Sequence, residues 1–244
     1  MPMLLRVIEP HGHPLGDLYA ATEEPETPGD GWRPLAGRSL WAQLLLGASA
    51  LVSLVALLSD LATRGVVTRE PALITYADLQ AIDDRDSLIG IATVAVILVT
   101  GIVFLTWVHR AARNLTELGA TDLRFTPGWS VGYWFVPILN LWRPKQVIDD
   151  LWRASDADGD EWKARSTPGL TLIWWPALLL SGFLARASGS TDIQALSDLR
   201  HRNGLDLMSD LTGLVAAVVA ILLVRAVTAR QEARAELLAP DAAY

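Results

Sequence analysis

The sequence predicts an all-α membrane protein with four transmembrane helices plus a re-entrant or interfacial helical segment. Three observations lead to this prediction. The 244-residue chain is 51% hydrophobic and 19% charged, so it is more apolar than an ordinary soluble domain. Four stretches are nearly free of charge and approach the roughly 20 residues that a helix needs to cross a membrane. Lysine and arginine are also unevenly distributed between the loops, which bears on orientation.

The four spans form a predicted membrane domain over residues 39–229. The first ends before Asp60, and the second is an unbroken apolar run before His109. The third contains Pro176, which predicts a kink that neighbouring helices tolerate. The fourth has 14 uncharged residues between Asp210 and Arg225, so Asp210 is expected about one turn below the membrane surface. The predicted spans cover residues 40–58, 88–108, 168–185 and 207–227.

The segments outside the spans give three further expectations. Residues 1–38 are polar and rich in proline, bury little surface and are predicted to form a disordered cytoplasmic tail. In the acidic loop after the first span, Tyr76, Leu79 and Ile82 are spaced for a short amphipathic helix that caps the bundle. Residues 230–244 are predicted to form a C-terminal cytoplasmic tail that extends the fourth helix.

An uncharged interval between Arg124 and Arg143 decides whether the chain crosses the membrane four or five times. It is just long enough to span, but proline and glycine interrupt it, and proline breaks a helix interior. We therefore predict that residues 125–142 form a re-entrant or interfacial segment that does not cross. The interrupting residues are Pro127, Gly128, Gly132, Pro137 and Asn140.

The positive charges favour four spans. With four spans, 14 of the 20 lysine and arginine residues lie on the side of both termini, whereas a fifth span would divide them nine against 11. Cytoplasmic loops carry an excess of these residues. We therefore expect a multi-pass protein of the cell (plasma) membrane with cytoplasmic N- and C-termini.

Residues 144–154 are predicted to form an amphipathic surface helix. Apolar side chains recur there at the spacing of one helix face, and charged side chains occupy the other face. Such a helix is expected to lie on the inner membrane surface. The apolar face comprises Val147, Ile148, Leu151 and Trp152, and the polar face comprises Asp149, Asp150 and Arg153.

The central part of the chain resembles an uncharacterised integral-membrane family, domain of unknown function 4328. The resemblance covers roughly residues 38–230 and implies a membrane protein, without implying an activity, a substrate or a catalytic residue. The matching positions are Phe104, Trp107, Arg110, Arg113, Asn114, Leu118, Gly119, Ala120, Phe125, Pro127, Gly128, Trp129, Trp134, Phe135, Pro137, Asn140, Pro144, Leu151, Trp152 and Ser155, with the pair Trp174 and Trp175.

One group of polar residues is a candidate binding site. Arg110 and Asn114 follow Trp107 by three and seven positions, so the three share one helix face. With Asn140 and Arg143, they could form an anion or lipid-headgroup site in which arginine binds phosphate or carboxylate. The alternative is structural: these side chains could satisfy carbonyl groups that the proline-broken segment leaves unpaired.

The sequence contains no catalytic, metal-binding or cofactor-binding motif. There is no phosphate loop, serine elbow or dinucleotide fingerprint. The acidic stretch of residues 156–161 lacks the glycine and glutamate spacing of a calcium loop. The net charge of −7, without a basic stripe, argues against nucleic acid as a partner. We therefore expect no cofactor, no metal and no enzymatic activity.

The leading functional hypothesis is a non-enzymatic module that binds membrane lipids, a protein partner or a second copy through residues 125–152. The alternative is a small-solute or ion transporter or channel subunit that acts as an oligomer. A transporter predicts polar groups that converge inside the bundle. Few such residues are found in the spans: Gln43, Ser49, Ser53, Thr93, Thr100 and Thr212.

Overall fold

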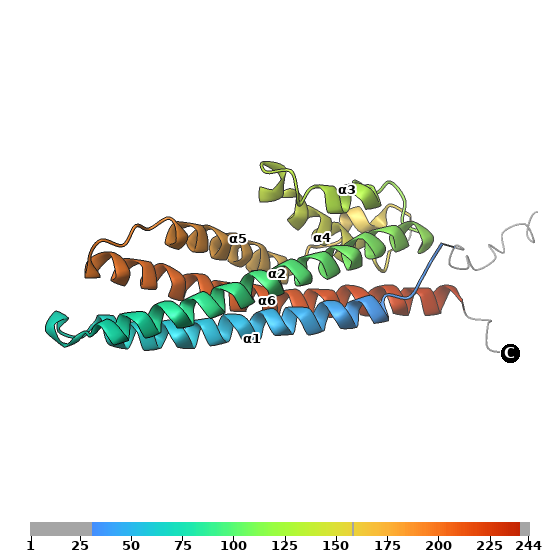
Figure 1. The fold of residues 1–244 in the computed structure, drawn as a ribbon. Helices are drawn as coiled ribbons and strands as arrows, with labels where there is room; N and C mark the ends of the chain where they lie inside the picture. The colour runs from blue at the N-terminus through green and yellow to red at the C-terminus, as the bar shows by residue number, and fades with distance from the viewer. Residues whose placement is uncertain (1–30, 158, 240–244) are drawn as a thin grey trace, which may run out of the picture.

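The computed structural model describes residues 31–157 and 159–239, and within these ranges the fold is all-α (Figure 1). The four long helices are α1 (Ala36–Val67), α2 (Tyr76–Glu117), α5 (Gly169–Gly189) and α6 (Leu196–Leu238). The shorter elements are η1 (Pro71–Leu73), α3 (Pro127–Gly132), η2 (Leu139–Leu141), α4 (Arg143–Ala154) and η3 (Glu161–Ala164). The four long helices are each long and apolar enough to cross a membrane, which confirms the predicted fold class.

The long helices extend beyond the predicted spans. The 42 residues of α2 cover about 63 Å at roughly 1.5 Å per residue, about twice the thickness of the hydrocarbon layer. The prediction of a separate amphipathic cap helix near Tyr76 is wrong, because those residues form the first turns of α2. A capping box starts the helix there: Asp78 N–H donates to Thr75 Oγ1 (3.2 Å), and Thr75 N–H donates to Asp78 Oδ2 (2.9 Å).

Side chains of distant helices hold the segment before α1. The backbone N–H groups of Leu35 and Ala36 donate to Glu232 Oε1 at 2.6 and 3.1 Å, and Leu35 is fully buried. Leu35 and Ala36, which the sequence placed in the disordered tail of residues 1–38, are therefore held in place. Residues 1–30 lie outside the described residues. At the other terminus, α6 continues to Leu238.

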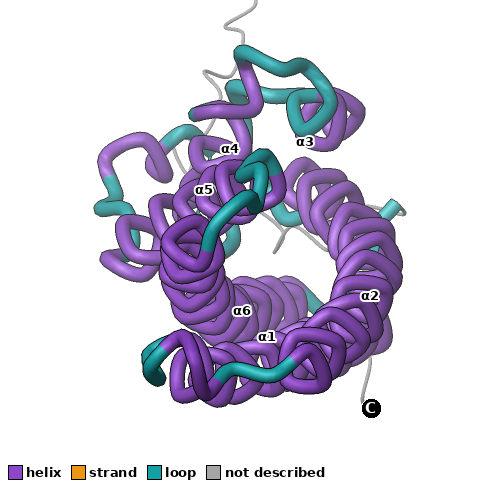
Figure 2. The backbone as a smooth tube through the Cα atoms, turned by 60° about the vertical axis from the view of Figure 1, so that its left-hand side comes forward, coloured by secondary structure: helices purple, strands orange, loops and turns teal. Residues whose placement is uncertain are grey.

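The long helices pack in the order α2, α1, α6, α5. Helix α1 packs along α2 and α6, and α5 packs along α6. Helices α2 and α5, in contrast, do not pack against each other along their lengths. In the view of Figure 2, the backbones of α2, α1, α6 and α5 follow one another around the bundle in this order. The start of α1 and the end of α6 lie together (Figure 1), and we call this the termini end. We call the opposite end, with the loops 68–75 and 190–195, the loop end.

Residues 125–142 form short pieces and no spanning helix, as predicted. Thr126 caps α3, with Trp129 N–H donating to its Oγ1 (3.4 Å), and the chain then turns through η2 into α4. Helix α3 packs against α2, beside the termini half of the bundle (Figure 1). This segment adds Trp134 to an aromatic cluster with Phe104, Trp174 and Trp175, in which neighbouring ring centroids lie 5.3 to 6.3 Å apart.

Helix α4 differs from the predicted surface helix. Its apolar residues Val147, Ile148 and Leu151 are buried, but Asp149 and Asp150 on the other face are also buried. The helix packs against α2, α5 and α6 instead of presenting an acidic face to water. Basic partners make this burial possible: Lys145 Nζ lies 2.6 Å from Asp149 Oδ2, Arg124 Nε lies 3.4 Å from Asp150 Oδ2, and Arg153 also pairs with Asp150.

Candidate functional site

Two of the predicted site residues belong to a buried polar network at the termini end. Trp107 Nε1 donates to Thr228 Oγ1 (3.1 Å), and Asn114 Nδ2 donates to Gln231 Oε1 (3.2 Å). Gln231 Nε2 donates in turn to Ala111 O (3.0 Å). Trp107, Asn114 and Gln231 are fully buried. Because the side-chain amides of Asn114 and Gln231 both have partners, these bonds fix α2 against α6 and favour a structural role for Trp107 and Asn114.

Arg110 and Asn114 also donate to carbonyl groups, but not to those of the proline-broken segment that the structural alternative named. Arg110 Nη2 donates to Gly31 O (2.6 Å), and Asn114 Nδ2 donates to Arg33 O (3.0 Å). Both carbonyls belong to the segment before α1 and not to residues 125–142. Near the proline-broken segment, His109 Nδ1 lies 3.0 Å from Pro127 O.

Asn140 and Arg143 do not join this group. Asn140 lies in η2, where its backbone N–H donates to Val136 O (2.8 Å). The Arg143 guanidinium lies over the rings of Phe125 and Tyr133, 5.6 Å from each centroid. The structure therefore divides the five predicted residues between two places, with Trp107, Arg110 and Asn114 in the first.

A basic pocket lies beside Arg110, between the segment before α1, the outer side of α2 and α3. Its volume is about 850 Å³. We call it the arginine pocket and define it by its lining residues. They are Gly31, Arg33, Arg38, Ile102, Leu105, Thr106, His109, Arg110, Arg113, Gly128, Val131 and Phe135.

The four arginines of the arginine pocket lack carboxylate partners. Among the described residues, no ion pair joins Arg33, Arg38, Arg110 or Arg113 to an acidic group, and no acidic residue lines the pocket. Arg110 Nε is buried and has no hydrogen-bond partner in the described part of the chain. At the same end, Arg124, Lys145 and Arg153 pair with acidic residues of α4. The Glu117 carboxylate lies beside Gly31 and acts electrostatically on Arg110, although it forms no ion pair there. With four arginines and one nearby carboxylate, the pocket carries a net positive charge that an anion can neutralise.

A second cavity lies inside the bundle, and sequence reasoning missed it. Its volume is about 620 Å³, and all four long helices line it. Its polar residues are Ser49, Ser53, Ser59 and Asp60 from α1, Asp86, Thr93 and Thr100 from α2, Ser181 from α5, and Arg202, Asp206, Ser209 and Asp210 from α6. Asp206 and Asp210 are four positions apart on one helix face, a signal that could have indicated the cavity.

Comparisons with known proteins identify the family of the chain. The family model described as a domain of unknown function (DUF4328) matches residues 70–229. Because this match covers more than half of the chain, the protein belongs to that family, as the sequence resemblance predicted. No curated protein and no solved structure matches the chain. Its function is therefore inferred from the geometry of the arginine pocket and the bundle cavity.

Proposed function

We propose that this DUF4328 protein is a non-enzymatic membrane module that binds an anionic lipid headgroup in the arginine pocket. One observation carries the proposal: four arginines line one pocket without a carboxylate partner among the described residues. A guanidinium group donates paired hydrogen bonds to phosphate oxygens, so a phosphate group is a suitable ligand.

The apolar part of the pocket favours a lipid over a soluble anion. Ile102 and Phe135 line the pocket, and their side chains are 65% and 72% exposed. Large apolar side chains this exposed on a membrane helix and its neighbour are suited to contact with acyl chains. A headgroup bound by Arg113 and Arg38 would leave its acyl chains along this apolar surface.

The orientation of the chain supports the same ligand. The basic residues gather toward the termini end, and the positive-inside tendency then puts both termini in the cytoplasm. In a plasma membrane, the cytoplasmic leaflet carries the anionic lipids. The arginine pocket would then face the leaflet that contains its ligand.

The test is native mass spectrometry of the full-length protein, exchanged into equal amounts of phosphatidylglycerol and phosphatidylcholine. We expect one retained phosphatidylglycerol per chain. The variants Arg113→Gln and Arg38→Gln each lose a charge-assisted contact, which should weaken retention by roughly tenfold. Arg186→Gln changes an exposed arginine near the loop end that does not line the pocket, and it should retain the lipid.

Two results would contradict the proposal. Equal retention of the two lipids would mean that the headgroup charge is not recognised. Equal loss of phosphatidylglycerol from the Arg113→Gln and Arg186→Gln variants would mean that the pocket does not provide the site. Adding inorganic phosphate distinguishes a lipid from a free anion: if phosphate displaces no lipid at millimolar concentration, the apolar surface contributes to binding.

Transport by an oligomer is a second candidate, and the bundle cavity favours it. The serine, threonine and aspartate residues in the cavity come from all four long helices, which is the convergence that the sequence analysis required of a transporter. Phe104, Trp134 and Trp174 line the cavity toward the termini end and contact one another. Solute flux into liposomes above that of empty liposomes would favour transport over a binding module.

A further inference from the structure

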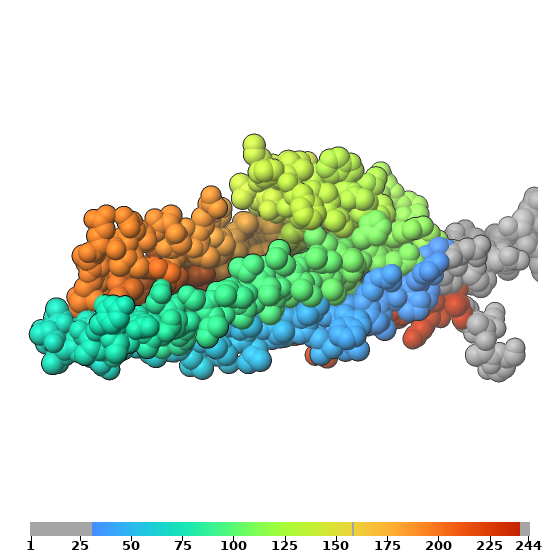
Figure 3. Space-filling view, viewed as in Figure 1, coloured from blue at the N-terminus to red at the C-terminus, as the bar shows by residue number. Residues whose placement is uncertain are grey.

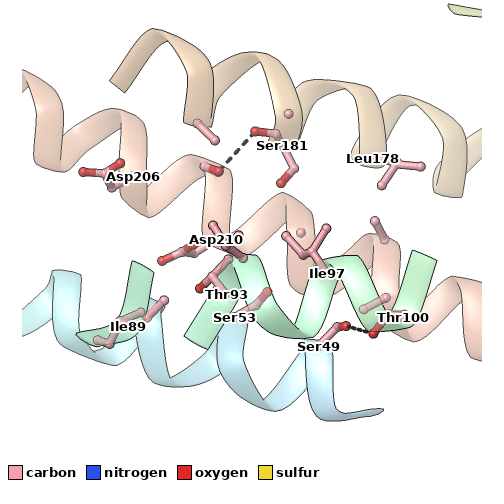
Figure 4. Close-up of a pocket in the computed structure, with 18 of the residues that line it drawn as sticks. Ser49, Ser53, Ile89, Thr93, Ile97, Thr100, Leu178, Ser181, Asp206 and Asp210 are labelled. Atoms are coloured by element: carbon pink, nitrogen blue, oxygen red, sulfur yellow. Dashed lines mark hydrogen bonds between the residues drawn. The ribbon is translucent and has the colours of Figure 1, made fainter. Parts of the chain in front are cut away.

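The bundle cavity combines an apolar body with an acidic end. Its walls include Ile97 from α2 and Leu178 from α5, and Figure 4 shows these side chains on opposite sides of it. Ser49 Oγ and Thr100 Oγ1 form a hydrogen bond with each other (3.0 Å), and Ser209 Oγ donates a hydrogen bond to Ser181 O (3.1 Å). These hydroxyl groups therefore already have partners within the protein. The volume of about 620 Å³ lies within the range of small-molecule sites, roughly 300–1,000 Å³.

Four carboxyl groups lie at the loop end of this cavity: Asp60, Asp86, Asp206 and Asp210. Asp206 pairs with Arg202 (3.8 Å), and Asp86 lies 4.0 Å from Arg85. Asp60 and Asp210 form no ion pair with a base among the described residues, and both line the cavity near enough to each other to interact electrostatically. Two adjacent carboxyl groups away from bulk water attract positive charge strongly.

Two buried polar atoms at this carboxyl pair, one of them on Asp60 itself, have no hydrogen-bond partner in the part of the chain that the structure describes. Ser59 Oγ and Asp60 Oδ2 are buried without a hydrogen-bond partner among the described residues. The exposed fractions of Ser59 and Asp60 are 8% and 7%, and both residues line the cavity. A buried polar group without a hydrogen-bond partner lowers the stability of the folded protein, because its lost contact with water is not replaced. A ligand in the cavity that offers positive charge would lower this cost.

The cavity is accessible from the side of the bundle. Helices α2 and α5 do not pack along their lengths, and the surface between them is hollowed (Figure 3). Toward the termini end, the ring centroid of Trp134 lies 5.7 Å from that of Phe104 and 6.3 Å from that of Trp174. These three rings close the cavity at that end. A ligand would therefore enter between α2 and α5, from the lipid phase.

We infer that this cavity binds an amphiphilic organic cation, with its positive group against Asp60 and Asp210 and its apolar body between α2 and α5. The apolar walls and the side entrance select a lipid-soluble molecule, and the carboxyl pair selects a positive charge. A metal ion is a poorer match, because the described residues contain no group of three acidic or histidine side chains arranged to hold one. This site lies at the opposite end of the bundle from the arginine pocket and does not depend on it.

The test measures equilibrium binding to the full-length protein in nanodiscs of zwitterionic lipid. Two probes are compared, tetraphenylphosphonium and tetraphenylborate, because they share shape and apolar surface but carry opposite charge. We expect saturable binding of tetraphenylphosphonium above that of empty nanodiscs, and no saturable binding of tetraphenylborate. The Asp60→Asn, Asp210→Asn double variant should weaken binding by roughly tenfold or more.

Matched controls separate a binding effect from a folding effect. The double variant is expected to fold, because asparagine keeps the shape of each side chain and removes the charge of two neighbouring acids, of which Asp60 is buried and Asp210 half-buried. Asp84→Asn changes an exposed acid near the loop end that does not line the cavity, so its affinity should be unchanged. Gly182→Leu fills the cavity, and a Cβ atom at Gly182 meets no atom within 4 Å. It should also weaken binding, whereas Gly65→Leu, which is outside the cavity, should not.

Three results would overturn the inference. The first is an unchanged affinity for tetraphenylphosphonium in the double variant, which would show that the carboxyl pair does not contact the cation. The second is equally tight binding of tetraphenylborate. The third is undiminished binding in Gly182→Leu, which would place the probe elsewhere on the protein.

Discussion

Asn114 Nδ2 and Gln231 Oε1 lie 3.2 Å apart, although 117 positions separate the two residues in the chain. Both side chains are fully buried. Asn114 also donates to Arg33 O (3.0 Å), and Gln231 Nε2 also donates to Ala111 O (3.0 Å). This pair therefore joins α2, α6 and the segment before α1, and so fixes one wall of the arginine pocket.

Replacing Gln231 should destabilise the termini end. Gln231→Leu leaves Ala111 O and one Asn114 N–H without these side-chain partners, which should cost about 1–3 kcal/mol. The expected result is a lower midpoint of thermal unfolding in detergent. Gln194→Leu, at an exposed position in the loop before α6, should change the free energy of unfolding by less than about 0.5 kcal/mol. Equal midpoints for the two variants would show that the network does not stabilise the fold.

Two tryptophans of the aromatic cluster should respond differently to the same change. Trp175 Nε1 donates to Leu141 O (2.8 Å), whereas Trp134 Nε1 is buried and has no hydrogen-bond partner within residues 31–157 and 159–239. Trp175→Phe should therefore lower the free energy of unfolding by about 1–3 kcal/mol more than Trp134→Phe does. Thermal unfolding of the two single variants tests this ordering. The reverse ordering would contradict the assigned hydrogen bond.

Asp150 should make stability depend on pH. Burial raises the pKa of this carboxyl above its ordinary value of 3.8, although Arg124 and Arg153 oppose the shift. The folded state then holds the proton more tightly than the unfolded state, so this group's contribution to stability falls as pH rises from about 4 through the folded pKa. The difference in melting midpoint between the wild type and Asp150→Asn should therefore change across this window. A difference that is constant with pH would exclude such a shift.

The helices could be predicted because they depend on local charge patterns. The uncharged run before His109 and the proline-broken segment after Arg124 each indicate their structure without reference to distant residues. The shared helix face of Trp107 and Asn114 could also be predicted, because it depends only on their spacing in the sequence. Their partners could not be predicted, because Thr228 and Gln231 are distant in the chain and Arg33 lies in a segment expected to be disordered.

The bundle cavity could not be predicted for a related reason. Asp60 and Asp210 each lie near the end of an apolar run, where a charge normally contacts the membrane surface. Whether their carboxyl groups meet depends on how α1 and α6 are rotated about their axes, and packing determines that rotation. The burial of the acidic face of α4 could not be predicted for the same reason, because Arg124, which pairs with Asp150, comes from outside that helix.

Cysteine labelling tests the four-span topology, on which the placement of the arginine pocket in the cytoplasmic leaflet depends. The native chain has no cysteine, so single cysteines at exposed Thr121, Ser166, Glu70 and Asp192 can be probed separately. In intact cells, a membrane-impermeant maleimide should label Glu70→Cys and Asp192→Cys. Thr121→Cys and Ser166→Cys should react only after permeabilisation. Labelling of Thr121→Cys and Ser166→Cys from opposite sides of the membrane would contradict the four-span topology.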